Sequence, residues 1–208
     1  VDAKEVGKNI GLIPLGFTEI WSASFNSAII ISAGDNAEFI AFCGINLDIT
    51  IFNKENVYLP AFLKTYPFLN VEVENKDKKV NSLIAIDNNP KYVAKDKKIF
   101  ILDKEKNLSK QVATKVELIK ELNSQRAVCR RIIAELKKLD LLIKKGLRVK
   151  IEGKEEKVIL EEFYVINMEK LLKLDDKIIA GFARKGWMGI FDAHLKSISN
   201  FEKILKAN

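Results

Sequence analysis

The chain contains one histidine, His194, so acid–base or nucleophilic chemistry of the Ser–His–Asp type would have to be built around this residue. Asp192 is two positions away and would lie on a different face of a helix, where it could not orient the imidazole. Glycine-rich phosphate-binding loops and the G-x-S-x-G nucleophile motif are absent from the sequence. The sequence therefore identifies no catalytic residue. We interpret His194 as a structural or surface histidine and leave open whether the protein is an enzyme, with a non-enzymatic role favoured.

Cysteine and carboxylate chemistry has little support in the sequence. Cys43 and Cys129 lie far apart, which excludes a cysteine-rich zinc module and a disulfide-dense scaffold. Cys129 falls on an apolar stripe, so we expect it to act as a small hydrophobic residue; the alternative is a thiolate activated by nearby Arg126. Adjacent acidic pairs such as Glu161-Glu162 are interpreted as solvated charge. We expect no metal and no cofactor.

Composition predicts a folded, basic protein. The chain has 208 residues, of which 48% are hydrophobic, and a formal net charge of +7. The positive charge is concentrated after residue 75, above all between Ser109 and Lys145, which raises the hypothesis of nucleic-acid binding. Because the basic residues there are scattered and no aromatic residues are interleaved for base stacking, we expect no nucleic-acid partner.

The chain also lacks the patterns of exported and membrane proteins. Its apolar runs are short compared with the roughly 20 residues of a membrane span, and residues 1–21 do not resemble a signal peptide. We therefore expect no membrane span and a cytoplasmic location. Because the sequence begins at Val1, a removed leader leaves a cell-surface or envelope location as the alternative.

Three β-hairpins are predicted. Residues 28–31 and 38–42 flank Gly34-Asp35-Asn36, which has the chemistry of a hairpin turn. Residues 68–74 alternate apolar and polar side chains and return as residues 80–86. Residues 147–151 and 158–166 have the β-branched content of a third hairpin. We expect these hairpins to form one antiparallel sheet.

A long amphipathic helix is the clearest element. Apolar residues recur every three, four or seven positions from Val112 to Leu136, and we expect the helix to end at Gly146 with a break near Asp140. Shorter helices should follow Asn167, with another from Trp187 to about Ile198. The fold class is therefore α+β: antiparallel hairpins, one long central helix and a helical C-terminal segment. We expect one domain over residues 1–208, sheet-rich and acidic to about 103 and basic from about 104.

Several segments carry unusual motifs in a fixed order. They are Y-L-P-A-F-L-K-T-Y-P-F at 58–68, L-I-A-I-D at 83–87, I-F-I-L-D at 99–103, Q-R-A-V-C-R at 125–130, L-D-L-L at 139–142 and A-H-L-K-S-I-S-N at 193–200. Together they resemble the SapC family of bacterial surface-layer-associated proteins, from about residue 12 to the C-terminus. The resemblance implies a non-enzymatic accessory or interaction protein of the cell envelope or surface layer, whose partner is another protein or an envelope component. Its oligomeric state is left open.

The alternative function is an enzyme or enzyme partner that binds a peptide or a small anionic ligand around His194 and Arg126. A spacing of three would place His194, Ser197 and Asn200 along one helix face, where they could bind a polar ligand. Tyr58 and Tyr66 could form an aromatic wall, and Arg126 an anion-binding fork.

Structural roles are the competing interpretation of the same residues. Asn200 and Ser199 could cap the last helix, and Tyr66-Pro67 could shape a turn. If Arg126 is buried, it requires an acidic partner or several carbonyl groups.

Overall fold

The main sheet of the computed structural model has five antiparallel strands. The structure describes residues 2–74, 80–89, 100–149 and 156–206. Along the sheet the strands are β1 (Leu12–Pro14), β3 (Phe39–Phe42), β2 (Ala28–Ser32), β7 (Lys157–Ile166) and β6 (Leu142–Val149). The predicted hairpin β2–β3 is confirmed, with Gly34 at a φ of 92° in its turn. The pairing of β2 with β7 joins the two halves of the chain in one sheet.

The second predicted hairpin has the expected strands but forms a sheet of its own. Strands β4 (Phe68–Glu74) and β5 (Val80–Ile86) pair only with each other among the described residues. The expectation of one sheet is therefore wrong. Phe68 packs instead against Val112 and Ile119 of the long helix α4 (Lys110–Lys138), in a small cluster separate from the main core.

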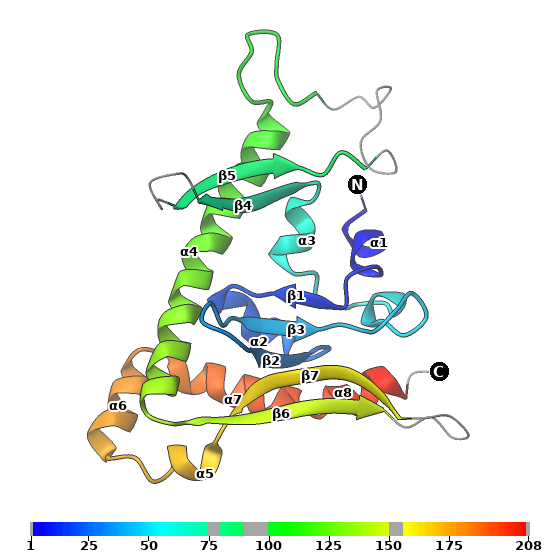
Figure 1. The fold of residues 1–208 in the computed structure, drawn as a ribbon. Coiled ribbons are helices and arrows are strands. Elements are labelled where there is room, and N and C mark those ends of the chain that lie inside the picture. The colour runs from blue at the N-terminus through cyan, green and yellow to red at the C-terminus, as the bar shows by residue number, and fades with distance from the viewer. Residues whose placement is uncertain (1, 75–79, 90–99, 150–155, 207–208) are drawn as a thin grey trace.

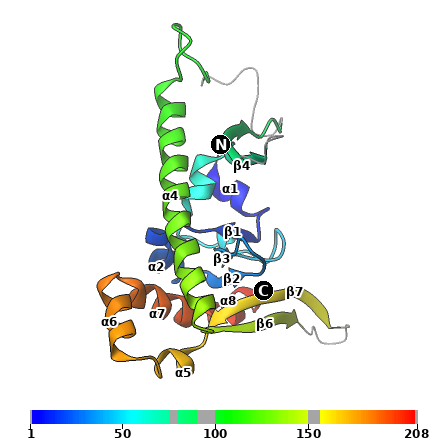
Figure 2. The same cartoon turned by 60° about the vertical axis from the view of Figure 1, so that its left-hand side comes forward.

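Helix α4 extends beyond the main sheet, as Figures 1 and 2 show. Its C-terminal half packs on the core through Cys129, Ile132 and Leu136. Its N-terminal half lies beside the β4–β5 hairpin and contacts β4. We call β4, β5, residues 100–109 and the N-terminal half of α4 the arm. The rest of the described chain is the body.

The predicted end of the long helix needs a correction. A break near Asp140 is confirmed, because Asp140 has a φ of 53° and α4 ends at Lys138. Residues 144–146 do not continue a helix but belong to β6, where Lys144 pairs with Glu162 at 2.5 Å. Helical periodicity stops before these residues, and cross-strand pairing with β7 determines their conformation.

Short helices complete the body. Within the first 65 residues of the sequence these helices are α1 (Ala3–Gly7), η1 (Phe17–Glu19), α2 (Ile20–Ala23), η2 (Ile51–Asn53) and α3 (Ala61–Thr65). At the C-terminal side lie α5 (Met168–Leu171), α6 (Asp176–Arg184), α7 (Trp187–Ser197) and α8 (Asn200–Leu205). Phe201 of α8 packs against Phe42 and Phe163 of the sheet, with ring centroids 5.0 and 5.7 Å apart. None of the helices described is long and apolar enough to cross a bilayer.

Replacing Gly7 with alanine tests the packing of α1 against its neighbours. A Cβ atom at Gly7 would lie 2.8 Å from the ring of Phe52 and 2.9 Å from Leu63 Cδ1, both in the core. We expect Gly7→Ala to lower the free energy of unfolding by about 1–3 kcal/mol in urea denaturation. Gly181→Ala is the control, because a Cβ there meets nothing and alanine favours a helix by about 1 kcal/mol. Equal effects of the two substitutions would contradict the packing described.

Candidate functional site

Two side chains of α7 replace a missing part of the β2–β7 ladder. The two strands pair at two positions only, and Ile29 would face Ile166 if the register continued. Instead, the Ile29 N–H donates to Ser197 Oγ at 2.9 Å, and the Ile166 N–H donates to Nε2 of His194 at 3.1 Å. Helix α7 contacts both strands and runs behind β7 in Figure 1. His194 and Ser197 therefore satisfy backbone donors that the diverging strands leave without strand partners.

His194 is fully buried and neutral. It has no exposed surface, and its ring lies edge-on to Phe39 at 6.0 Å. Because Nε2 accepts a hydrogen bond, the neutral ring carries its proton on Nδ1. Burial lowers the pKa of His194 to about 4. A hydrogen bond with the backbone of Ile29 acts in the opposite direction and raises the pKa, but its effect is smaller than that of burial. The imidazole is therefore placed to hold a strand end, not to exchange protons with a substrate.

Asn200 ties the C-terminal helices to the start of β2. Its Nδ2 donates to the carbonyls of Ser24 and Ser27 at 2.8 and 3.0 Å. Neither Asn200 nor Ser199 caps α8 with its side chain, because the Ser199 hydroxyl donates to the Lys196 carbonyl. The capping interpretation is therefore replaced by a different structural role. His194 and Ser197 lie three residues apart on α7, but Asn200 belongs to the separate helix α8, so the single helix face predicted for the three residues does not form. The polar atoms named here bind the chain's own backbone.

Arg126 is partly buried and has an acidic partner. Its Nε and Nη2 donate to the two carboxylate oxygens of Glu38 at 3.2 and 2.7 Å, and Arg130 donates to the same carboxylate at 3.1 Å. Glu38 is buried, just before β3. This bidentate pair docks α4 on the sheet and occupies the fork that we considered for an anionic ligand.

Arg126 and His194 do not share a pocket. Arg126 binds Glu38, whereas His194 packs against Phe39, the next residue. Consecutive residues of an extended strand point to opposite faces, so the two side chains lie on opposite sides of β3. The structure therefore does not assemble the pocket around His194 and Arg126 that the alternative function needs.

Tyr58 joins a buried carboxylate that the sequence analysis missed. Glu19 accepts hydrogen bonds from the Tyr58 hydroxyl at 3.0 Å, the Ala61 N–H at 2.6 Å and the Gly16 N–H at 2.9 Å. Burial and then the charge of Glu19 raise the pKa of Tyr58. The spacing of three between Gly16 and Glu19 resembles a capping box, and this spacing is the one sequence feature that could have pointed to Glu19. The group fixes the start of α3.

Tyr66 lies at the base of the arm, where α3 is followed by β4. The Tyr66-Pro67 peptide is cis and connects α3 to β4. The Tyr66 hydroxyl donates to Asp87 Oδ2, and the two residues come from two motif segments that are distant in the sequence. Both line a cavity of about 480 Å³. Tyr66 is therefore a predicted site residue that lines a cavity.

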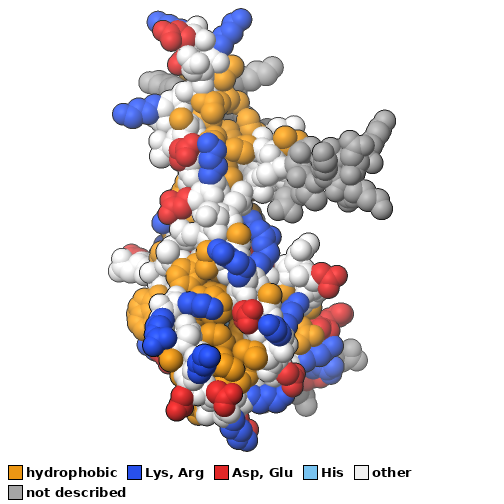
Figure 3. Space-filling model, turned by 90° about the vertical axis from the view of Figure 1, so that its left-hand side faces the viewer, with side chains coloured by type: hydrophobic (Ala, Val, Ile, Leu, Met, Phe, Trp, Pro, Cys, Tyr) orange, Lys and Arg blue, Asp and Glu red, His pale blue; other side chains and the backbone are white. Residues whose placement is uncertain are grey.

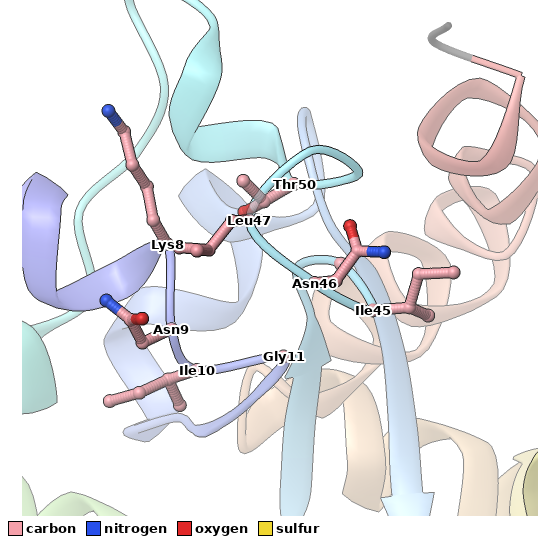
Figure 4. A pocket seen from close by; sticks show the side chains of 9 residues that line it. Lys8, Asn9, Ile10, Gly11, Ile45, Asn46, Leu47 and Thr50 are labelled. Carbon is pink, nitrogen blue, oxygen red and sulfur yellow. The ribbon is translucent and has the colours of Figure 1, made fainter.

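A second cavity, of about 200 Å³, lies between residues 8–11 and the loop 44–50 (Figure 4). Asn46 uses its side-chain oxygen to accept from the N–H groups of Asp48 and Ile49. Lys8 pairs with Glu5 at 2.5 Å, and its side chain is directed away from Asn46 in Figure 4. The polar groups named here thus serve the local fold.

Cysteine and metal chemistry also find little support in the structure. Burial raises the pKa of both Cys43 and Cys129 to about 12, which outweighs the opposing effect of Arg126 and Arg130 on Cys129. Within residues 2–74, 80–89, 100–149 and 156–206, no group of three or more His, Cys, Asp or Glu side chains is placed to bind a metal ion.

Exposed apolar side chains gather on the arm. Nine of the sixteen large hydrophobic residues that are exposed in the described chain lie there: Val71, Val73, Leu83, Ile84, Ile86, Phe100, Ile101, Leu102 and Leu108. Figure 3 shows hydrophobic side chains along this part of the molecule. Val71 pairs with Leu83, so both lie on the sheet face opposite Phe68. The arm therefore presents apolar surface that its small cluster does not bury.

The sequence model of the SapC family matches residues 1–204 of the chain. Comparison with curated proteins found no match. Comparison with solved structures found none either.

The buried imidazole makes stability depend on pH. In the unfolded chain His194 takes up a proton near its ordinary pKa of 6.5, but in the folded protein only near 4. Its contribution to the free energy of unfolding is therefore complete above pH 6.5 and falls by about 3 kcal/mol as the pH decreases to 4. We expect the difference between the wild type and His194→Gln, measured by urea denaturation from pH 4 to 7, to follow this curve. A difference that is constant with pH would contradict it.

The Glu38 pair predicts a loss of stability that an exposed pair does not. Glu38→Gln removes the charge that holds two arginines, and we expect the free energy of unfolding to fall by about 2–3 kcal/mol. Glu117→Gln is the matched control, because its pair with Lys120 is exposed, and we expect a change below about 0.5 kcal/mol. Chemical denaturation at pH 7 measures both. If Glu38→Gln were as mild as the control, the pair would not dock α4.

Proposed function

We propose that this chain, which belongs to the SapC family, is a non-enzymatic accessory or interaction protein of the bacterial cell envelope, associated with the surface layer. One observation carries the non-enzymatic part of the proposal. The side chains best suited to chemistry, His194, Ser197 and Arg126, bind the chain's own backbone and Glu38. Because these groups are committed to the fold, we infer that the protein acts by binding.

The arm is the proposed binding surface. Its apolar face around Val71 and Leu83 is exposed, with 39% and 54% of these residues accessible to solvent. Strand β5 pairs on one side only among the described residues, and its sequence contains no charge and no proline. By contrast, β1 ends at Pro14 and β6 carries Lys144 and Lys145, which are features that protect edge strands.

A protein is the partner that fits this surface best. The open edge of β5 offers backbone N–H and C=O groups, which an extended segment of another protein can pair with while its side chains cover the apolar face. A glycan or a lipid surface does not supply a matching ladder. We therefore propose that the arm docks a protein component of the envelope, and that the chain acts at the envelope from the cytoplasmic side or at the cell surface.

A photo-crosslinking amino acid at Leu83, introduced in cells, tests this proposal, with one at Leu47 as the control. Leu47 is equally exposed but lies on the body. We expect a specific envelope protein to crosslink at Leu83 and not at Leu47. With the purified partner, Val71→Lys combined with Leu83→Lys should weaken binding at least about tenfold, because buried lysines must lose their hydration, while Leu47→Lys should not. Equal crosslinking at both positions, or unchanged affinity, would refute the docking role.

A further inference from the structure

The cavity at the base of the arm combines an apolar wall with a carboxylate. It lies where α1, α3 and the β4–β5 sheet come together (Figure 1), and its volume of about 480 Å³ is within the range of small-molecule sites. Ile10, Phe62 and Leu69 provide apolar surface, and Asn9 and Asp87 provide polar groups. Leu69 lies on the same face of the β4–β5 sheet as Val71 and Leu83, but neither Val71 nor Leu83 is among the residues that line the cavity.

Asp87 is held in place by three hydrogen bonds. Its Oδ2 accepts from the Tyr66 hydroxyl, its Oδ1 accepts from the Asn89 N–H at 2.9 Å, and its own N–H donates to the Pro67 carbonyl at 2.9 Å. The hydrogen bond from Tyr66 and then that from Asn89 lower the pKa of Asp87, so the carboxylate is ionised at neutral pH. A carboxylate has about four acceptor positions, and two are used here.

The charge of Asp87 has no counter-ion within the described chain, because no Lys or Arg side chain there forms an ion pair with it. Two lysines on neighbouring elements have other partners: Lys8 pairs with Glu5, and Lys115 donates to the carbonyls of Lys64 and Tyr66. A carboxylate beside an apolar wall, without an ion-pair partner among the described residues, is complementary to a ligand that brings a cation.

Asn9 adds a second acceptor. Its Nδ2 donates to the Glu5 carbonyl at 3.1 Å, which fixes the amide and leaves Oδ1 as the group that can accept a hydrogen bond. The cavity therefore offers a negative charge and a neutral acceptor. An ammonium group has three donors and no acceptor, so this set suits it and does not suit an anion.

We propose that this cavity binds an aliphatic primary ammonium group. The ammonium pairs with Asp87 and donates to Oδ1 of Asn9, while its methylene stem packs on Ile10, Phe62 and Leu69. The same chemistry is found in a free alkylamine and in the lysine side chain of a docked protein. The inference goes beyond the docking function, because it concerns other residues and a different ligand chemistry.

NMR titration of the full chain with n-butylamine at pH 7 tests the proposal, with 1-butanol and butyrate as probes of the same stem. We expect butylammonium to shift the amide signals of residues around the cavity, such as Leu69 and Asn89. Butanol should bind at least about tenfold more weakly because it lacks the charge, and butyrate should not bind. Equal binding of butanol, or shifts elsewhere in the molecule, would overturn the proposal.

Asp87→Asn is the decisive variant, because asparagine keeps the acceptor for the Asn89 N–H and removes the charge. We expect the affinity for butylammonium to fall at least about tenfold, while Asp35→Asn, in the exposed β2–β3 turn, leaves it unchanged. Unchanged affinity of Asp87→Asn, with the amide spectrum showing an intact fold, would overturn the proposal.

Two further measurements separate the sources of the amine and the two proposals. N-acetyl-lysine methylamide that binds as well as butylamine supports a lysine side chain as the ligand, and binding of butylamine alone supports a free amine. Crosslinking at Leu83 does not depend on Asp87, so the docking function and the amine site can fail independently.

Discussion

A sheet whose central strands diverge must satisfy the backbone groups that lose their partners, and two side chains of α7 do so here. His194 and Ser197 accept the Ile166 and Ile29 N–H groups where the β2–β7 ladder ends. Leaving such buried donors unpaired would cost about 1–3 kcal/mol each. These two hydrogen bonds hold α7 against β2 and β7, which come from the two halves of the chain. Asn200 adds two more hydrogen bonds to the backbone just before β2. The C-terminal motif is therefore an architectural one.

Local patterns predicted the elements well, whereas their assembly could not be predicted from them. Alternation along residues 68–74 and 80–86 gave the β4–β5 hairpin at its observed bounds, but no local signal shows that this hairpin leaves the main sheet for α4. Helical periodicity gave α4 and its break, yet Lys144 and Lys145 suit a helix end and an edge strand equally well. Cross-strand pairing, a non-local interaction, decides between them.

The candidate site shows the same division. The spacing of three correctly placed His194 and Ser197 together on α7, but Asn200 lies on the separate helix α8. Spacing also does not reveal whether such side chains bind a ligand or the backbone. For Arg126, burial energetics required an acid, and Glu38, distant in the sequence, provides it. Glu38, Glu19 and Asp87 escaped the sequence analysis as site residues because their roles depend on contacts between distant segments. The surfaces that we propose for partners are the exposed apolar face of the arm and the cavity at its base.

The ¹⁵N NMR signals of the His194 imidazole test the architectural role most directly. The account predicts a ring that carries its proton on Nδ1, has an unprotonated Nε2 coupled to the Ile166 amide, and stays neutral at pH 6. An imidazole that exchanges its proton rapidly with water and titrates near its ordinary pKa would contradict the account, because a solvent-accessible histidine could take part in chemistry.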